Sequence, residues 1–283
     1  MTRDQVTVFI PLKHYHEGYL RQAIDCVFRQ TRSDWRLLFV VNASSTPHFR
    51  KLLAEPLADE RVRLIQRQHP RLAGAYNAAM RAAETEFVAP LLGDDLWTPD
   101  AVEVLGDCIR TQPRIDFFHS GRYFVDGDNN RISSDYLPAA AVSAGQFVVA
   151  SPVRHLLCWR APVGIACGGV DETLENFGSD DYDFPWTMFE FGARFHAIPK
   201  PLYIVRDHRD SFRLTTHVPL SVQRRGLRRI LKKHGVAPAL IRERIHDDVR
   251  DYLKQSLFRN RLHRWIRERT GFDAQRGWRE SYR

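Results

Sequence analysis

The sequence predicts an α/β fold, in which a mostly parallel, mixed sheet is flanked by helices and followed by a C-terminal helical appendage. Two observations support this prediction. Short apolar runs rich in β-branched and aromatic residues alternate with segments whose apolar residues recur at helical spacing, and from about residue 220 the helical spacing continues alone. A chain of 283 residues is long enough for one large core with an appendage.

The first 110 residues predict four strands, each followed by a helix. In such sheets, ligands bind beyond the carboxyl ends of the strands, so we expect the polar clusters at 13–18, 42–47 and 93–98 to share one edge. The expected strands are 6–12, 35–41, 61–65 and 87–92, and the expected helices are 19–30, 48–57, 73–83 and 100–110.

The second half is less regular. An aromatic-rich segment at 116–124 predicts a strand that ends in a hairpin turn at 127–130, and 194–205 predicts strands interrupted by prolines. A helix is expected over 178–191, with its acidic residues at the N-terminal end. We therefore divide the chain into a domain at 1–219, with halves at 1–100 and 101–219, and an extension at 220–283.

The net charge of +8 is confined to the extension. From Leu220 onward there are 18 Lys and Arg against 7 Asp and Glu, whereas the first 219 residues carry 24 against 27. A basic amphipathic helix can lie on anionic lipid, but an apolar stripe of this size more often packs on the main domain or on a second subunit, with the arginines solvated. No nucleic-acid-binding motif is present, so we expect no nucleic-acid partner.

The cysteines and the termini indicate a cytoplasmic protein. The four cysteines are far apart and form neither a C-x-x-C pair nor a zinc cluster, as is typical of buried thiols in a reducing compartment. There is no signal peptide and no apolar stretch of about 20 residues that could span a bilayer.

Phosphate-loop and G-x-G-x-x-G motifs and a nucleophile elbow are also missing from the sequence.

Three segments, in this order, resemble the family 2 glycosyltransferases, whose fold is the Rossmann-like GT-A fold. The resemblance covers about residues 6 to 211 and implies a nucleotide-binding half at 1–100 and an acceptor half at 101–219. The matching segments are Ile10-Pro11 with 19–25 and Gln30-Thr31, then 90–100 (PLLGDDLWTPD), then 168–172 (GGVDE) with 178–183 (GSDDYD), 192–195 and 198–203.

The resemblance implies that Asp181 is the catalytic base. In the family, the second acid of an acidic pair takes the proton of the acceptor hydroxyl during a single, inverting displacement, and this position corresponds to Asp181 in Ser179-Asp180-Asp181. These acids can also be ordinary charges at a helix N-terminus. On the acceptor side, the resemblance further implies Gly169, Asp180, Asp183 and Trp97.

The resemblance also implies a divalent metal, Mg²⁺ or Mn²⁺, held at the turn after the fourth strand. The family pattern L-D-x-D-D corresponds to Leu91-Leu92-Gly93-Asp94-Asp95, so Leu92 replaces one ligand and Asp94 is retained. His208, in an H-x-D-S segment, is a second possible ligand, although a lone histidine is often structural.

Donor recognition departs further from the family. The acidic end of the second strand is replaced by Asn42, which can still hydrogen-bond a base. Lys13 and His14 can approach a phosphate or remain solvated, and Asn77 keeps a family asparagine although Tyr76 replaces its arginine neighbour. The expected donor-binding residues are Pro11, Leu12, Lys13, Asn42, Asn77, Gly93, Asp94 and Asp95.

The resulting hypothesis is a transferase that uses a nucleoside-diphosphate sugar, with a carbohydrate, lipid-linked or small-molecule acceptor. Two alternatives stay open. Because Leu92 removes a metal ligand, the transferase can be metal-independent, and a GT-A domain without activity can serve as a binding or scaffold module. Homo-oligomer formation or peripheral membrane contact through 220–283 is also open.

Overall fold

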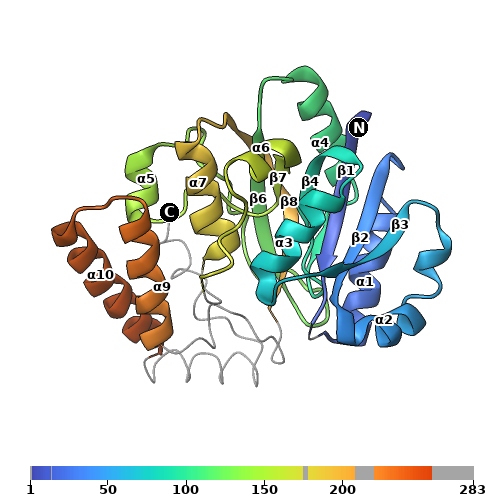
Figure 1. The fold of residues 1–283 in the computed structure, drawn as a ribbon, viewed down its shortest axis with the longest axis horizontal. Helices are drawn as coiled ribbons and strands as arrows, with labels where there is room; N and C mark the ends of the chain where they lie inside the picture. Colours follow the sequence, from blue (N-terminus) through green and yellow to red (C-terminus); the bar gives the residue numbers. More distant parts are fainter. Residues whose placement is uncertain (1, 14, 175–177, 208–219, 257–283) are drawn as a thin grey trace. The chain divides into compact units, whose positions relative to one another are not determined.

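The computed structural model describes residues 2–13, 15–174, 178–207 and 220–256. The chain divides into two compact units, residues 1–212 and 213–283. The boundary between them lies seven residues before the one predicted from the sequence, after residue 219. The predicted α/β class is confirmed, because the first unit is built on an eight-stranded mixed sheet flanked by helices (Figure 1). Its strand order is β3-β2-β1-β4-β7-β6-β8-β5.

The four N-terminal strands of the sheet are parallel, and the others are mixed. β7 is antiparallel to both β4 and β6, β6 and β8 are parallel to each other, and β5 is antiparallel to β8. The strands are β1 (Thr2–Pro11), β2 (Trp35–Asn42), β3 (Val62–Arg67), β4 (Thr85–Pro90), β5 (Leu96–Trp97), β6 (Phe117–Asp126), β7 (Leu157–Arg160) and β8 (Phe195–Asp207).

The helices of the first unit follow the strands as predicted in its N-terminal half, with bounds that shift by a few residues. They are α1 (Glu17–Phe28), α2 (Thr46–Leu52), α3 (Arg71–Ala82), α4 (Ala101–Thr111), α5 (Ala144–Val149), α6 (Ala161–Ala166) and α7 (Phe184–Glu190), with short helical turns at Ala43–Ser45, Pro56–Ala58 and Ser179–Asp183.

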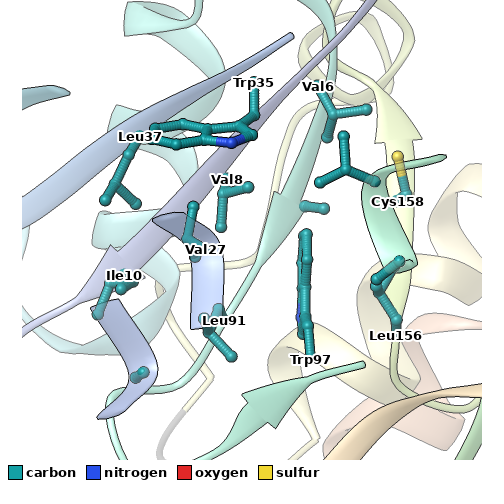
Figure 2. Packing of buried hydrophobic residues seen from close by; sticks show 14 of the residues in the cluster. Val6, Val8, Ile10, Val27, Trp35, Leu37, Leu91, Trp97, Leu156 and Cys158 are labelled. Atoms are coloured by element: carbon teal, nitrogen blue, oxygen red, sulfur yellow. The ribbon is translucent and has the colours of Figure 1, made fainter. Parts of the chain in front are cut away.

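Alternation along the strands creates two hydrophobic layers. Val8 and Ile10 of β1 are fully buried on one face, in a cluster with residues of α1, α2 and α4. Figure 2 shows Val8, Val27 of α1 and Trp35 of β2 in this layer. Phe9 points to the opposite face, where α3 and α7 cover the sheet. The helices therefore lie on both faces, as expected of a mainly parallel sheet.

The structure differs from the prediction mainly between residues 144 and 207. β7, α5 and α6 were not predicted, and the proline-interrupted segment forms one strand, β8, whose pairing with β6 shifts register around Gly121. The hairpin turn at 127–130 is confirmed, because Val125 and Arg131 form an antiparallel bridge. The expected helix at 178–191 begins with a π-helical turn at Ser179–Asp183 and continues as α7.

The second unit contains α9 (Leu220–Lys233) and α10 (Pro238–Ser256), which pack against each other. One face of α9 is buried, including Leu227, Ile230 and Leu231, while Arg224, Arg228 and other cations of the helix are exposed. None of the helices in the described residues is long and apolar enough to cross a membrane.

Candidate active site

Polar residues gather where β2, β1 and β4, which are neighbours in the sheet, end at their carboxyl termini. The chain leaves β1 and β4 still hydrogen-bonded to the sheet, since Leu12 N donates to Val40 O and Leu91 N donates to Phe9 O, each at 2.9 Å. Lys13 is then exposed, and Asp94 is half-buried in the turn after β4. These bonds fix where each polar segment begins.

Asp95 fixes that turn onto β8. Its Oδ2 accepts a hydrogen bond from Tyr203 Oη at 2.9 Å, and its Oδ1 accepts one from Arg206 N at 2.9 Å. Asp95 is only 5% exposed. Burial, followed by the charge of Asp95, raises the pKa of Tyr203 well above its usual value, so the phenol stays protonated and donating. Because both carboxylate oxygens are engaged inside the protein, the geometry gives Asp95 a positioning role.

Arg206 is a buried connector that the sequence analysis missed. Its Nε donates to Asp94 O at 2.8 Å, one Nη donates to Gln22 Oε1 at 2.8 Å, and the other donates to Asn129 Oδ1 at 2.5 Å. One guanidinium therefore ties the turn after β4 to α1 and to the hairpin after β6. The only available signal was an arginine at the end of an otherwise apolar strand.

On the donor side, Asn42 is held by a neighbouring arginine. Its Oδ1 accepts a hydrogen bond from Arg67 Nε at 2.5 Å, and Arg67 also donates to Arg71 O at 2.7 Å. Pro11 is half-buried, and Leu12, at 1% exposed, belongs to the core and can offer only its backbone. The side-chain carbonyl of Asn42 is thus held in one orientation by Arg67.

Gly93 and Trp97 belong to the packing of the turn. A Cβ on Gly93 would lie 3.5 Å from Leu20 and 3.6 Å from Leu12, which are ordinary contact distances. Trp97 is 2% exposed and stands in the core near Leu91 (Figure 2). The expected acceptor-side role of Trp97 is therefore not supported by its position, because its ring is enclosed by apolar side chains.

Asn77 joins the two halves of the first unit. Its amide lies on α3 and exchanges two hydrogen bonds with Val170, accepting from Val170 N at 2.8 Å and donating to Val170 O at 2.9 Å. It also donates to Glu172 Oε1 at 2.7 Å. Gly169 has φ +74°, and a Cβ there would lie 2.5 Å from Asn77 Oδ1. Asn77 is 6% exposed, so its contacts are structural ones.

The acidic turn at Ser179–Asp183 gives its members different environments. Asp183 is fully buried. Asp180 accepts a hydrogen bond on Oδ2 from Tyr76 Oη at 3.1 Å. Burial, and then the neighbouring charge of Asp181, raise the pKa of Asp180 to about 7. The hydrogen bond that Tyr76 donates favours the ionised carboxylate and so opposes part of this rise in pKa.

Asp181 differs from Asp180 in its hydrogen bonding rather than in its exposure. It is partly exposed, and its carboxylate has no hydrogen-bond partner within the described residues. Its backbone oxygen accepts a hydrogen bond from Ser151 Oγ at 2.5 Å, which holds the turn in place. A fixed backbone with a free carboxylate is the arrangement that a general base needs.

The possible metal site rests on Asp94 alone among the described residues. His208 lies outside them, as does His14, and they include no group of three His, Cys, Asp or Glu side chains that could hold a metal ion. Asp95 is engaged elsewhere and Leu92 carries no ligand atom. Magnesium is nevertheless often held by one or two carboxylates together with substrate phosphates and water, so the single carboxylate of Asp94 fits such a site.

Comparison with known proteins extends this picture. WfgD of Escherichia coli, named as a UDP-Glc:alpha-D-GlcNAc-diphosphoundecaprenol beta-1,3-glucosyltransferase, is 28% identical over 190 residues, which cover 66% of this chain and 67% of WfgD. The chain spans 16%, 31% and 27% of the length of three other curated relatives.

Two solved structures share the fold. TarS 1-349 of S. aureus, in complex with UDP-GlcNAc, superposes with a TM-score of 0.61 at 15% identity, covering 88% of this chain and 73% of that one. The mannosyltransferase PcManGT of Pyrobaculum calidifontis, in complex with GDP-Man and Mn²⁺, gives 0.57 at 18% identity, covering 86% and 68%. These likenesses confirm the GT-A fold.

The family itself is established by sequence. The profile described as Glycosyl transferase family 2 matches residues 7–161, more than half of the chain. The match includes the turn at Asp94 and ends before the acidic turn at Ser179–Asp183. The chain therefore belongs to glycosyltransferase family 2.

Proposed function

We propose that the chain transfers a sugar from a nucleoside-diphosphate donor to an acceptor hydroxyl, with inversion and with Asp181 as the general base. The observation that carries the proposal is the contrast within the acidic turn. Asp180 is bonded to Tyr76 and Asp183 is fully buried, whereas the Asp181 carboxylate is partly exposed and has no hydrogen-bond partner in the described residues. Family membership supplies the reaction class.

In the proposed reaction, Asp181 takes the proton of the acceptor hydroxyl while the hydroxyl oxygen attacks the anomeric carbon of the donor sugar. The bond from that carbon to the donor phosphate oxygen breaks at the same time, and the nucleoside diphosphate leaves with the bonding electrons. A divalent metal held by Asp94 would supply positive charge to the departing diphosphate. Asp95, Tyr203 and Arg206 hold the turn that carries Asp94.

A donor screen tests the first part of the proposal. Thermal unfolding is measured with UDP, GDP and dTDP, each with and without Mn²⁺, because a ligand that binds only the folded state raises the unfolding temperature. Stabilisation by one nucleotide is expected. If none of the three stabilises the protein, the donor hypothesis is wrong, and the reading as a scaffold without activity gains support.

A pair of matched substitutions tests the base. Asp181→Asn removes the proton acceptor and is expected to lower turnover at least about a thousandfold while nucleotide binding stays within about twofold. Asp180→Asn, at the adjacent residue, keeps a hydrogen-bond acceptor for Tyr76 and is expected to retain much more activity. Equal losses in both variants, or retained turnover in Asp181→Asn, would contradict the assignment.

One observation favours metal-independent transfer as the second candidate. Leu92 occupies the first carboxylate position of the turn that we propose for the metal, and of the two remaining acids Asp95 is bonded to Tyr203 and Arg206, so Asp94 is the candidate ligand. Asp94→Ala separates the candidates. If metal is used, the variant loses the additional stabilisation that Mn²⁺ gives to the nucleotide complex, whereas in metal-independent transfer Mn²⁺ has no effect on either protein.

For the extension, we propose peripheral contact with an anionic membrane surface. α9 exposes cations such as Arg224 and Arg228 while its apolar face is buried, so the proposed contact is electrostatic. Sedimentation with anionic vesicles at low salt should carry the protein into the pellet, and high salt should release it. A change of oligomeric state with no vesicle binding would instead favour contact between subunits.

A further inference from the structure

Two buried side-chain nitrogen atoms near the acidic turn have no hydrogen-bond partner among the described residues, and the guanidinium of Arg154 lies close to one of them. Arg122 of β6 has a buried Nε, and His155 has a buried Nε2, and neither atom has a partner in the part of the chain that is described. His155 is 8% exposed, and Arg122 and Arg154 are half-buried. Buried donors without partners cost free energy, so their presence calls for a ligand that satisfies them.

The backbone holds these residues next to Asp181. Arg122 stands opposite Tyr203 in the pairing of β6 with β8, and the His155 ring lies 5.2 Å from the Tyr203 ring. The segment 151–156 begins at Ser151, which donates to Asp181 O at 2.5 Å. It ends at Leu156, which is hydrogen-bonded to Ser120 of β6. The segment therefore bridges the acidic turn and Arg122.

Within the described residues, the positive charges of this cluster exceed the negative ones that face it. Arg154 and Arg122 are close enough to repel each other, and burial, then Arg154, lowers the pKa of Arg122. The acids that face Arg122 are Asp181 and Asp95, and Asp95 already accepts from Tyr203 and Arg206 N. Two guanidiniums thus share one uncommitted carboxylate, Asp181.

The side chains suit an oxyanion. A guanidinium offers a planar fork of donors that matches phosphate and carboxylate oxygens. Burial lowers the pKa of His155 to about 4, so its ring is neutral near pH 7 and can donate one N–H without adding charge. A bound oxyanion would supply both the missing negative charge and the missing acceptors.

We propose that Arg122, Arg154 and His155 form a subsite that binds an anionic group, a phosphate or carboxylate, of the acceptor beside Asp181. All three belong to the half of the unit that carries Asp181, and β7 separates β6 from β4 in the sheet. We assign the subsite to the acceptor on this ground, although Asp95 of the turn after β4 also faces Arg122. It rests on the proposed transferase function, and it makes the acceptor an acidic saccharide or a phosphate-bearing molecule rather than a neutral sugar.

Inorganic phosphate is the probe of the subsite. Titration calorimetry is carried out on the full chain saturated with the nucleotide that stabilises it best, so that the donor site is already filled. Phosphate is expected to bind this complex, and Arg122→Gln and Arg154→Gln are expected to weaken that binding at least about tenfold. Arg114→Gln removes the same charge from an exposed arginine and should leave phosphate binding unchanged.

Three results would overturn the proposal. They are the absence of phosphate binding, loss of phosphate binding as soon as nucleotide is bound, and a tenfold weakening of nucleotide itself in Arg122→Gln. The last two would assign the arginines to the donor diphosphate. If Arg122→Gln does not fold, Arg122→Lys keeps the charge but not the fork, and it should bind phosphate more weakly than the parent chain and more tightly than a variant without the charge.

The phosphate titration and the nucleotide screen test the two proposals separately. If no nucleotide stabilises the protein, the proposed transferase function is wrong, and phosphate binding is then measured without nucleotide. If nucleotide binds but phosphate does not, the transferase function stands and the anionic acceptor is rejected. A transferase assay with matched acceptors that differ by one phosphate then tests the consequence, since Arg122→Gln should raise KM only for the charged acceptor.

Discussion

Alanine at Gly169 should break the connection between the two halves of the first unit. Gly169 has φ +74°, a conformation that costs an L-residue about 1–2 kcal/mol. The new Cβ would also lie 2.5 Å from Asn77 Oδ1, which is too close for contact. That oxygen accepts the hydrogen bond from Val170 N, so relieving the clash leaves a buried donor unsatisfied, at about 1–3 kcal/mol. The sum is about 2–5 kcal/mol.

The adjacent glycine provides a matched control. Gly168 has φ +100°, and a Cβ there would have nothing within 4 Å, so Gly168→Ala should cost only the backbone strain of about 1–2 kcal/mol. Urea unfolding, followed by circular dichroism, measures both free energies of unfolding. We expect Gly169→Ala to be the less stable by about 1–3 kcal/mol. Equal destabilisation of the two variants would refute the role assigned to the Asn77 contact.

Three further substitutions test the site. The pKa of Asp180, about 7 in the folded chain against 3.8 ordinarily, means that the folded state binds the proton more tightly, so native stability falls as pH rises from about 4 to about 7. Asp180→Asn should remove this pH-dependent loss of stability, which is at most about 4 kcal/mol. In chemical unfolding, the variant should therefore gain more unfolding free energy over the parent chain at pH 8 than at pH 5. Leu92→Asp should restore a metal ligand beside Asp94 and strengthen Mn²⁺-dependent nucleotide binding in calorimetry. If the nucleotide affinity in Mn²⁺ is unchanged, this turn does not bind the metal. Tyr203→Phe should cost about 1–3 kcal/mol in the unfolding free energy, because Asp95 keeps its charge but loses a donor, and a neutral effect would show that Arg206 N alone satisfies it.

The sequence was most informative where apolar runs are long. Residues 6–10 of β1 and most residues of β2 and β4 are buried, and the composition and end points of these strands predict the polar edge of the sheet. β7 has four residues and β5 has two, too few for a period to be visible. The π-helical turn at Ser179–Asp183 was likewise hidden, since its acidic residues are also typical of a helix N-terminus.

The site depends on contacts that no spacing encodes. Arg206 reaches Asp94 and Asp95 from more than a hundred residues away, and Tyr76 reaches Asp180 over a similar separation. The resemblance to the family predicts roles for Asp94 and Asp181, because both occupy motif positions. It also predicts an acceptor-side role for Trp97, whose ring lies in the core.

Two consecutive residues of α3 hold the two halves of the first unit together. Tyr76 donates to Asp180 at the start of the acidic turn, and Asn77 clasps the backbone of Val170. α3 also packs on β1, β2 and β4, whose ends carry the donor-side residues. Because one rigid helix holds both sets of groups, the position of Asp181 relative to Asp94 is set by the packing of α3. A substitution that shifts α3 should therefore lower turnover more than it lowers nucleotide affinity, since transfer needs both halves in register and nucleotide binding needs only one.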